Sequence, residues 1–227
     1  MSEVWDTLIK LQNDLITTFD SSGTEIYENG MDKFNKPNWI NRVWTSNKYR
    51  RAHVDVVDAR ESKGLWMMHC CIFPHLHSNA PIFGLDVVAG SRKITGFFHD
   101  YSPTESVDHP MIDDFTNSTE RLEWNKKREL PDWAKQIFNS DMISAGNIQS
   151  PEELQQLLNY SYESIFNYMW HISDYNNIAD ENVIKTAQNR YAHYQKQNPH
   201  TPRTMTALGL NADEVKEFIE VCLFPEI

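Results

Sequence analysis

The spacing of apolar residues along the chain predicts helices near both ends. Between residues 4 and 19 the apolar residues recur at spacings of three and four, which is typical of one buried face of an amphipathic helix. A second such face runs from residue 154 to residue 169. It follows Ser150-Pro151-Glu152-Glu153, which combines a capping serine, a proline at the first helical position and a glutamate three residues after the cap.

The stretch from residue 52 to residue 100 has a different pattern, with short runs of apolar and β-branched residues. These runs are 52–58, 65–73, 82–89 and 93–99. Pro74, Gly90 and Asp100 close the second, third and fourth run. Four strands with short links and no helical pattern between them predict an antiparallel sheet.

Two further helices are expected in the last third of the chain. One covers residues 180–197 and ends before Pro199. The other starts at Asn211, where Glu214 completes a capping box. The segment 25–44 is mixed, with predicted turns at Asn29-Gly30 and Lys36-Pro37.

This order of elements predicts the α+β class, in which helices cover a central antiparallel sheet. The chain has no internal repeat, no low-complexity linker and no boundary that divides it. Its 227 residues suit one large domain, and its apolar content of 40% suffices for one sizeable core. We therefore expect a single domain that spans residues 1–227.

The composition of the chain limits which partners it can bind and in which cellular compartment it is expected. The net charge of −11 argues against a nucleic-acid partner. The three cysteines include adjacent Cys70 and Cys71 and form no CxxC pair, so neither a disulfide framework nor an iron–sulfur site is indicated. Residues 1–11 carry Glu3 and Asp6 and lack a basic region followed by an apolar one, and no apolar run approaches about 20 residues. We therefore expect a soluble protein of the reducing cytoplasm without a membrane partner.

Four polar residues within the strand region are candidates for chemistry. His53 and Asp55 lie two positions apart, so an extended strand places both on one face. His69 and Asp86 each lie among apolar neighbours. A buried, unpaired carboxylate is very costly, so Asp86 must face a pocket, find a donor or carry a proton. An acid and an imidazole of this kind are the usual groups of proton-transfer catalysis.

Two other interpretations of these residues stay open. Asp86 could cap a turn after Gly84, with His69 as an ordinary core histidine. Alternatively, a metal-dependent hydrolase could use zinc ligands among His69, His75, His77 and His99. The pair His75 and His77 follows Pro74 in a predicted exposed turn, so we expect no metal site. Nucleotide-binding and hydrolase motifs are absent, so a reductase with this sequence would take its electrons from a partner protein.

Several blocks, in the same order along the chain, carry a resemblance to one family. They are WMMHCCIFP at 66–74, APIFGLDVVAG at 80–90, HDYSPT at 99–104, RELPDW at 128–133, and residues 195–203 with the final Leu223-Phe224. In these blocks the chain resembles the ferredoxin-dependent bilin reductases, and it is closest to their phycocyanobilin:ferredoxin oxidoreductase branch. The resemblance extends from about residue 45 to the end.

The resemblance implies a three-layer α/β/α sandwich with biliverdin IXα bound between the sheet and the C-terminal helices. It also implies an oxidoreductase that acts on CH–CH bonds of a linear tetrapyrrole through bilin radicals. Such an enzyme binds no cofactor of its own and receives its electrons from reduced ferredoxin.

The resemblance also assigns roles to individual residues. Asp86 matches the central aspartate, which bridges the pyrrole nitrogens and lactam oxygens and donates protons. His69 matches a histidine that faces the lactam on the far side, and His53 matches a histidine linked to it by hydrogen bonds. Asp55 completes the catalytic set. The residues expected to bind the substrate are Arg128, Gln195, Asn198 and Thr95.

Two departures from the family pattern bear on the product. Asp55 stands where phycocyanobilin-forming enzymes have a glutamate beside the D-ring vinyl group, and a shorter carboxyl reaches less far. Pro199 stands where many bilin reductases place an aspartate that serves the A-ring. Both resemble the phage-encoded offshoot that makes phycoerythrobilin through 15,16-dihydrobiliverdin. We therefore expect phycoerythrobilin, with phycocyanobilin or a non-catalytic bilin carrier as alternatives.

The remaining expectations concern the partner and the source. Ferredoxins are acidic, so docking one on this acidic chain requires a local concentration of cations. The two candidate clusters are Lys48/Arg50/Arg51 and Lys126/Lys127/Arg128. The resemblance further implies a monomer encoded by a cyanophage and made inside a cyanobacterial-type host.

Overall fold

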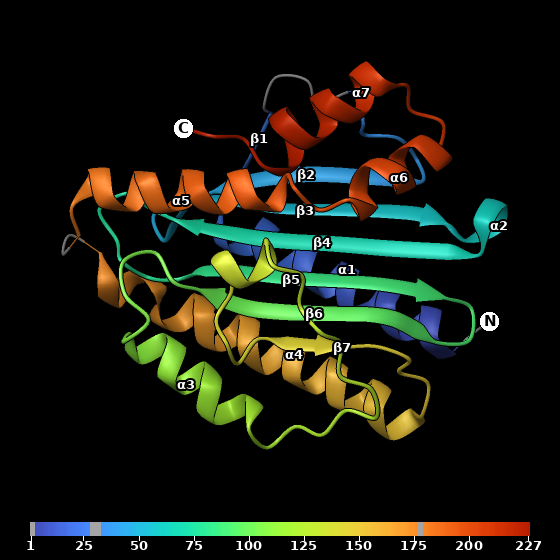
Figure 1. The fold of residues 1–227 in the computed structure, drawn as a ribbon, viewed down its shortest axis with the longest axis horizontal. Helices are drawn as coiled ribbons and strands as arrows, with labels where there is room; N and C mark the ends of the chain where they lie inside the picture. Colours follow the sequence, from blue (N-terminus) through green and yellow to red (C-terminus); the bar gives the residue numbers. More distant parts are fainter. Residues whose placement is uncertain (1–2, 28–32, 177–178) are drawn as a thin grey trace.

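A seven-stranded antiparallel sheet forms the centre of the computed structural model, which describes residues 3–27, 33–176 and 179–227 (Figure 1). Its strands follow one another in sequence order, so each strand pairs with the next one along the chain. The strands are β1 Thr24–Ile26, β2 Trp39–Thr45, β3 Tyr49–Ala59, β4 Leu65–Pro74, β5 Ile82–Gly90, β6 Ile94–Ser102 and β7 Ile143–Ala145. The four predicted strands, which are β3 to β6, are confirmed.

Three strands were missed by the sequence pattern. β1 and β7 have three residues each, too few to show a period. In β2, Asn41 and Arg42 interrupt the apolar pattern. The predicted turn at Lys36-Pro37 is confirmed, because Lys36 and Trp39 exchange two backbone hydrogen bonds of 2.8 and 2.9 Å. The predicted turn at Asn29-Gly30 lies outside the described residues.

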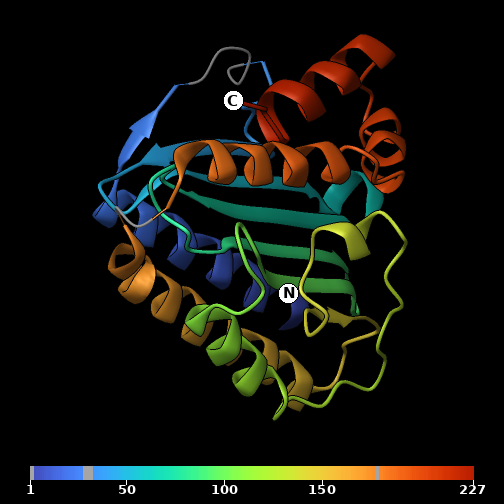
Figure 2. The ribbon, with the colours of Figure 1, turned by 60° about the vertical axis from the view of Figure 1, so that its left-hand side comes forward.

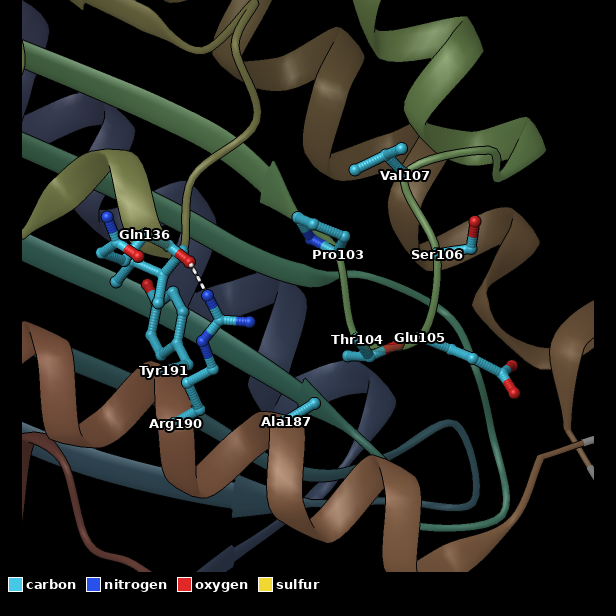
Figure 3. A pocket seen from close by; sticks show the side chains of 10 residues that line it. Pro103, Thr104, Glu105, Ser106, Val107, Gln136, Ala187, Arg190 and Tyr191 are labelled. Atoms are coloured by element: carbon cyan, nitrogen blue, oxygen red, sulfur yellow. Dashed lines mark hydrogen bonds between the residues drawn. The ribbon is translucent and has the colours of Figure 1, made fainter.

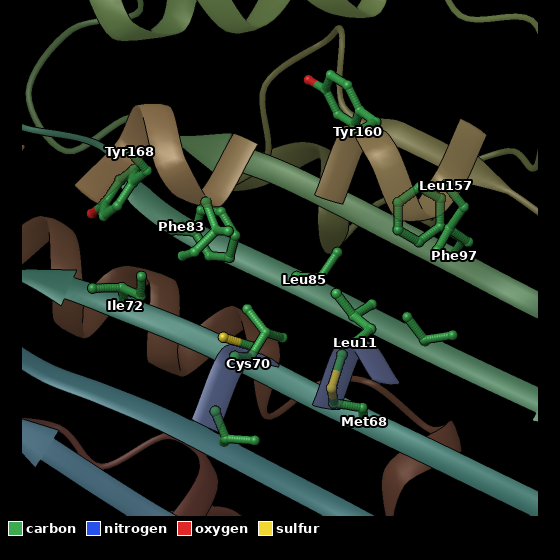
Figure 4. Close-up of a cluster of buried hydrophobic side chains, with 14 of the residues drawn as sticks. Leu11, Met68, Cys70, Ile72, Phe83, Leu85, Phe97, Leu157, Tyr160 and Tyr168 are labelled. Atoms are coloured by element: carbon green, nitrogen blue, oxygen red, sulfur yellow. The ribbon is translucent and has the colours of Figure 1, made fainter. Parts of the chain in front are cut away.

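Three helices cover one face of the sheet: α1 (Glu3–Ser22), α3 (Pro110–Thr119) and α4 (Pro151–His171) (Figure 2). Their apolar side chains pack with those of the central strands into the larger of two cores, part of which Figure 4 shows. The predicted start of α4 is confirmed, since the Ser150 hydroxyl accepts a hydrogen bond from the Glu153 N–H and Pro151 occupies the first turn.

The C-terminal elements cover the other face. They are α5 (Glu181–Gln195), α6 (His200–Ala207), α7 (Ala212–Glu217) and the π-helical turn η3 (Phe218–Leu223). These elements pack in the second core against β2, β3 and β4. The predicted capping box between Asn211 and Glu214 is confirmed, whereas α6 was not predicted. The short remaining elements are α2 (Arg60–Lys63), η1 (Ala134–Gln136) and η2 (Ile172–Tyr175).

Helices on both faces of one antiparallel sheet make a three-layer α/β/α sandwich, so the predicted fold class is confirmed. Within the described ranges, no helix combines the length and the apolar character that crossing a bilayer requires. For the site, the important consequence is that β3, β4 and β5 are adjacent central strands, because they carry all four predicted catalytic residues.

Candidate active site

The strand register places three predicted catalytic residues in one row. Asp55 on β3 pairs with His69 on β4, and His69 pairs with Asp86 on β5. Directly paired residues of antiparallel strands project from the same face. This face is the one that the C-terminal helices cover, since its neighbouring side chains belong to the second core. His53 lies two residues before Asp55 and opposite Cys71, so it shares the face.

The C-terminal helices leave part of this face only partly covered. Asp86 lies in the middle of a central strand, yet 38% of its side chain is exposed. From there to the end of β5, Val87 and Ala89 are buried whereas Val88 and Gly90 are half-buried. On β4, β5 and β6, the half-buried apolar side chains of this face are Leu65, Met67, Val88 and Phe98. We call these four residues the open floor; apolar side chains beside a few polar groups are typical of the lining of a ligand site.

His69 and Asp86 form a close pair beside the open floor. The distance between His69 Nδ1 and Asp86 Oδ1 is 2.7 Å. Burial alone would lower the pKa of His69, but the charge of the adjacent Asp86 carboxylate and its hydrogen bond raise it to about 10. His69 is therefore an imidazolium at neutral pH and donates its Nδ1–H to Asp86. This pair stores a proton next to a partly exposed carboxyl group.

Asp55 is a buried carboxyl group held by one donor. Its Oδ1 accepts a hydrogen bond of 2.7 Å from the Trp39 indole N–H. Burial raises the pKa of Asp55 to about 7, although the Trp39 hydrogen bond and the charge of His69 act in the opposite direction. Near neutral pH, a substantial fraction of Asp55 therefore carries a proton.

His53 is neutral and fully buried. Burial holds its pKa well below the usual value, and the nearby Arg51 and His69 act in the same direction. Its Nε2–H donates to the side-chain oxygen of Asn41 at 2.5 Å. In the part of the chain that the structure describes, His53 Nδ1 and His69 Nε2 are buried without a hydrogen-bond partner, and the two rings lie 5.9 Å apart. Buried polar atoms normally have a partner, so these two nitrogens are unsatisfied hydrogen-bonding groups beside Asp55 and Asp86.

Two predicted substrate-binding residues lie together at the rim of the open floor. The Arg128 guanidinium lies over the Phe98 ring, 5.2 Å from its centre, and donates to the Thr95 carbonyl at 3.2 Å. Arg128 and Thr95 are exposed. Since Phe98 pairs with Asp86, this cation lies near the catalytic row, where it can bind a carboxylate.

The other two predicted substrate-binding residues are engaged in other contacts. The buried Gln195 donates a hydrogen bond of 2.8 Å to the Tyr191 hydroxyl. That hydroxyl lies over Gly84, where an added Cβ would approach it to 3.2 Å. The side-chain oxygen of Asn198 accepts the His200 N–H at 3.0 Å, at the start of α6.

Sequence patterns did not identify Trp39, Asn41, Phe98 or Tyr191 as contributors to this site. Trp39 and Asn41 lie on β2, which was not predicted as a strand, so their contacts with Asp55 and His53 could not be inferred. Asn41 was detectable in one respect only: a polar residue among Trp39, Ile40 and Val43 suggests a buried partner.

Comparison with protein families decides the class of the protein. The family model described as "Ferredoxin-dependent bilin reductase" matches residues 8–225. The chain belongs to this family. It is therefore an oxidoreductase, and the resemblance inferred from its motifs is confirmed.

Individual relatives agree with this assignment. This bilin reductase is similar to the phycocyanobilin:ferredoxin oxidoreductase of Synechococcus sp. (strain CC9902), with 28% identity over 192 residues, covering 81% of this chain and 74% of that protein. It is also similar to the enzyme of the same name from Prochlorococcus marinus (strain MIT 9515), with 25% identity over 206 residues, covering 85% and 80%.

Two solved structures share its fold. The structure of PcyX is 33% identical and superposes with a TM-score of 0.73, covering 97% of this chain and 99% of that one. Phytochromobilin synthase from tomato, solved in complex with biliverdin, superposes with a TM-score of 0.76 and covers 97% of this chain and 82% of that one. At 16% identity, the tomato enzyme supports the fold alone.

The zinc interpretation is wrong for this bilin reductase. His99 lies on the opposite face of the sheet from His69, where its Nδ1–H donates to the Gly84 carbonyl at 2.6 Å. His75 and His77 stack on each other at 5.1 Å. Across residues 3–27, 33–176 and 179–227, no three His, Cys, Asp or Glu side chains form a group that could hold a metal ion. Asp86 lies inside β5, so it does not cap a turn either.

One of the two cation clusters predicted for ferredoxin docking is partly buried and contacts the helices. The Lys48 ammonium donates to the Met169 carbonyl at 2.7 Å. The Arg50 guanidinium donates to Gln188 at 2.6 Å, and Arg51 is buried, with a 2.7 Å hydrogen bond to the Cys222 carbonyl. These three cations hold the helical layers to the sheet. Lys126, Lys127 and Arg128 are exposed, as expected.

A cavity of about 190 Å³ lies between the segment after β6 and helix α5 (Figure 3). Its wall includes Thr104, Gln136, Arg190 and Tyr191, and the Arg190 guanidinium donates to the Gln136 carbonyl at 2.8 Å. None of the predicted catalytic residues lines it. It adjoins the end of β6 at Ser102, beyond Phe98 of the open floor, and its wall residue Tyr191 contacts Gln195.

Asp100 provides a prediction about stability in this bilin reductase. It is 1% exposed and accepts hydrogen bonds from the Ser102 hydroxyl and the Asn139 N–H, and burial raises its pKa to about 7. The folded state therefore binds this proton more tightly than the unfolded state does, so stability falls as the pH rises from about 4 to 7. Asp100→Asn should reduce this slope by up to about 1.4 kcal/mol per pH unit.

Urea unfolding at pH 5 and pH 7.5 measures this slope. The control is Asp132→Asn, because the Asp132 side chain is fully exposed. We expect this control to retain the wild-type difference between the two pH values. An equal difference in Asp100→Asn and wild type would contradict the prediction.

Proposed function

We propose that this protein reduces biliverdin IXα to a phycobilin, working as a monomer with one catalytic domain. The observation that carries the proposal is the row of Asp55, His69 and Asp86 beside the open floor. A flat tetrapyrrole lying on these apolar residues would bring its polar nitrogens and oxygens to the row. The family match and the cyanobacterial relatives, which are phycocyanobilin:ferredoxin oxidoreductases, support a bilin as the substrate.

Each double bond that is reduced takes up two electrons and two protons. Reduced ferredoxin supplies the electrons one at a time, so the bound bilin passes through a radical. Each added electron makes the bilin more basic, and the protein must then supply a proton. We assign this role to the His69–Asp86 pair, in which His69 passes its proton through Asp86 to the pigment.

The remaining substrate contacts follow from the position of each group. The Arg128 cation at the rim suits a propionate of the pigment. Thr95, Gln195 and Asn198 would supply neutral hydrogen-bonding groups. In the resting protein the Gln195 and Asn198 side chains already contact Tyr191 and His200. Binding through these two residues would therefore require an exchange of hydrogen bonds.

We propose phycoerythrobilin as the product, formed through 15,16-dihydrobiliverdin by four electrons and four protons. Its support is Asp55, whose short carboxyl is held by Trp39 within β2 and β3. Because Pro199 carries no proton, Asp86 or water would serve the A-ring step. One observation favours phycocyanobilin instead: with a pKa of about 7, Asp55 holds a transferable proton. A bilin carrier that leaves the pigment unreduced is the non-catalytic alternative.

Anaerobic turnover of biliverdin with reduced ferredoxin, followed by chromatography, tests the function. We expect a blue-green complex that is converted to phycoerythrobilin, with 15,16-dihydrobiliverdin as a transient. Accumulation of phycocyanobilin would support the alternative reaction. Recovery of unchanged biliverdin after the complex is incubated with reduced ferredoxin would support the carrier and reject catalysis.

The length of the Asp55 side chain provides a second test. Asp55→Glu should direct part of the product toward D-ring vinyl reduction, because the added methylene extends the carboxyl group toward the ligand. Asp58→Glu is the matched control, since Asp58 lies on the same strand but pairs with Arg60 at 2.7 Å. Chromatography of the products measures the effect. Identical product profiles for Asp55→Glu and wild type would reject Asp55 as the determinant of the product.

A further inference from the structure

Five cations from two distant segments meet at one corner of the molecule. Arg92 and Lys93 lie in the turn between β5 and β6, and Lys126, Lys127 and Arg128 lie in the segment before β7. Residues 144–147 join the two segments. The Lys93 ammonium donates to the Asn147 side chain at 2.8 Å, Gly146 N–H donates to the Lys126 carbonyl at 2.9 Å, and Arg128 N–H donates to the Ser144 carbonyl at 2.8 Å.

We call these five residues the cationic ridge, and its charge is not compensated. All five side chains are exposed, and none forms an ion pair with a carboxylate of the described residues. Glu129 is the adjacent acidic residue in sequence. Elsewhere, many cations are paired with carboxylates. Examples are Lys10, Lys33, Arg42, Arg60, Lys135 and Lys196.

This concentration of positive charge is notable because the whole chain carries −11. An acidic partner is repelled by most of such a surface, so an uncompensated positive patch steers it to one orientation. The ridge contains several exposed lysines and arginines within two short segments. It therefore fits a negatively charged protein surface.

The ridge also borders the proposed substrate site. Arg128 lies over Phe98, which belongs to the open floor and pairs with Asp86. Arg128 additionally contacts the Thr95 carbonyl at the start of β6. A protein docked on the ridge would therefore lie at the edge of a pigment bound on the open floor. Electron transfer requires this short separation.

We infer that the cationic ridge is the docking surface for ferredoxin, an inference that rests on the proposed function. In each encounter, one reduced ferredoxin loses one electron and the bound bilin gains it. The bilin then takes a proton from the His69–Asp86 pair, solvent restores that proton through the partly exposed Asp86, and the oxidised ferredoxin leaves the ridge. Four such encounters supply the electrons for phycoerythrobilin. The same ridge would serve every encounter, because the pigment stays bound.

The test is the double charge reversal Lys126→Glu/Lys127→Glu, which leaves Arg128 in place. The control is Lys185→Glu/Lys216→Glu, because these exposed lysines lie on α5 and α7, outside the ridge. The Kd for oxidised ferredoxin is measured by titration calorimetry at low and high salt. We expect the ridge variant to bind at least tenfold more weakly at low salt and to lose most of the salt dependence. The control should stay within twofold of wild type.

Two further measurements separate this inference from the proposed function. The absorption spectrum of bound biliverdin should be the same in the ridge variant and wild type, which shows that the variant folds and binds the pigment. Reduction of the bound pigment by dithionite, which needs no docking, should also be unchanged.

An unchanged Kd for ferredoxin in the ridge variant would overturn the inference, whatever the turnover. The inference would stand, and the proposed function would fail, if the ridge variant lost ferredoxin binding while wild-type protein left biliverdin unreduced.

Discussion

Asp86→Asn should lower the turnover of biliverdin by about 100-fold or more while the protein still binds the pigment. The amide has nearly the shape of the carboxyl group, so the pigment can still lie on the open floor. It has no transferable proton. The substitution has a second effect, since the Asp86 charge is what raises the pKa of His69 against its burial. Without this charge, burial lowers the His69 pKa, and the pair loses its proton at neutral pH.

The measurement is kcat with reduced ferredoxin at pH 7, together with the Kd for biliverdin from its absorption. Asp132→Asn, which changes a fully exposed aspartate, is the control and should behave as wild type. A wild-type kcat in Asp86→Asn would remove this residue from the mechanism. A lost biliverdin complex with an intact fold would assign Asp86 to binding instead.

His69→Gln should stop the reaction after the first electron, with an expected loss of about 100-fold in turnover. A glutamine amide can still donate a hydrogen bond to Asp86, but it cannot release a proton. The one-electron-reduced bilin should then accumulate, because the proton that would let the second electron follow is missing. Electron paramagnetic resonance of an anaerobic sample with reduced ferredoxin measures this radical directly.

His171→Gln is the matched control for this variant. His171 also lies beside a carboxylate, since its Nδ1 is 3.1 Å from Asp174, but the pair lies exposed at the end of α4. We expect normal turnover and no lasting radical in the control. Normal turnover without a lasting radical in His69→Gln would show that the proton comes from elsewhere.

The same pair predicts the pH dependence of the wild-type reaction. The pKa of His69 is raised to about 10, so the imidazolium persists through neutral pH and is lost as the pH rises toward 10. Turnover that depends on this proton should fall along the same alkaline range. The free energy that the pair contributes to folding also falls as the pH rises. It is complete below the unfolded pKa of about 6.5 and is lost toward pH 10.

Residue patterns within a few positions of one another predicted the helix starts, because a helix cap depends on residues that are close in sequence. Ser150 and Asn211 cap helices through backbone groups three positions away, and such contacts are visible in the sequence. Helix α6 was missed because Pro199 and Pro202 suggest a break. In the structure, Pro202 lies in the first turn of α6, where a proline is tolerated, so the chain continues as a helix.

The candidate residues were found for a related reason. Asp86 and His69 interrupt apolar strands, and a polar residue at such a position is costly unless it has a partner or a function. The sequence alone shows these polar residues among apolar neighbours. It also showed the ordered motifs of the bilin reductases, which the family match confirmed.

The sequence by itself determined the four central strands, the candidate acid and imidazole, and the family. Only the tertiary structure decided how these groups act together. The register of β3, β4 and β5 aligns Asp55, His69 and Asp86, β2 supplies the donor of Asp55, and the incomplete helical cover leaves the open floor. Residues 144–147 likewise bring residues 92–93 and 126–128 together. These contacts join segments far apart in the chain, so they depend on strand pairing and helix packing, which local residue patterns do not specify.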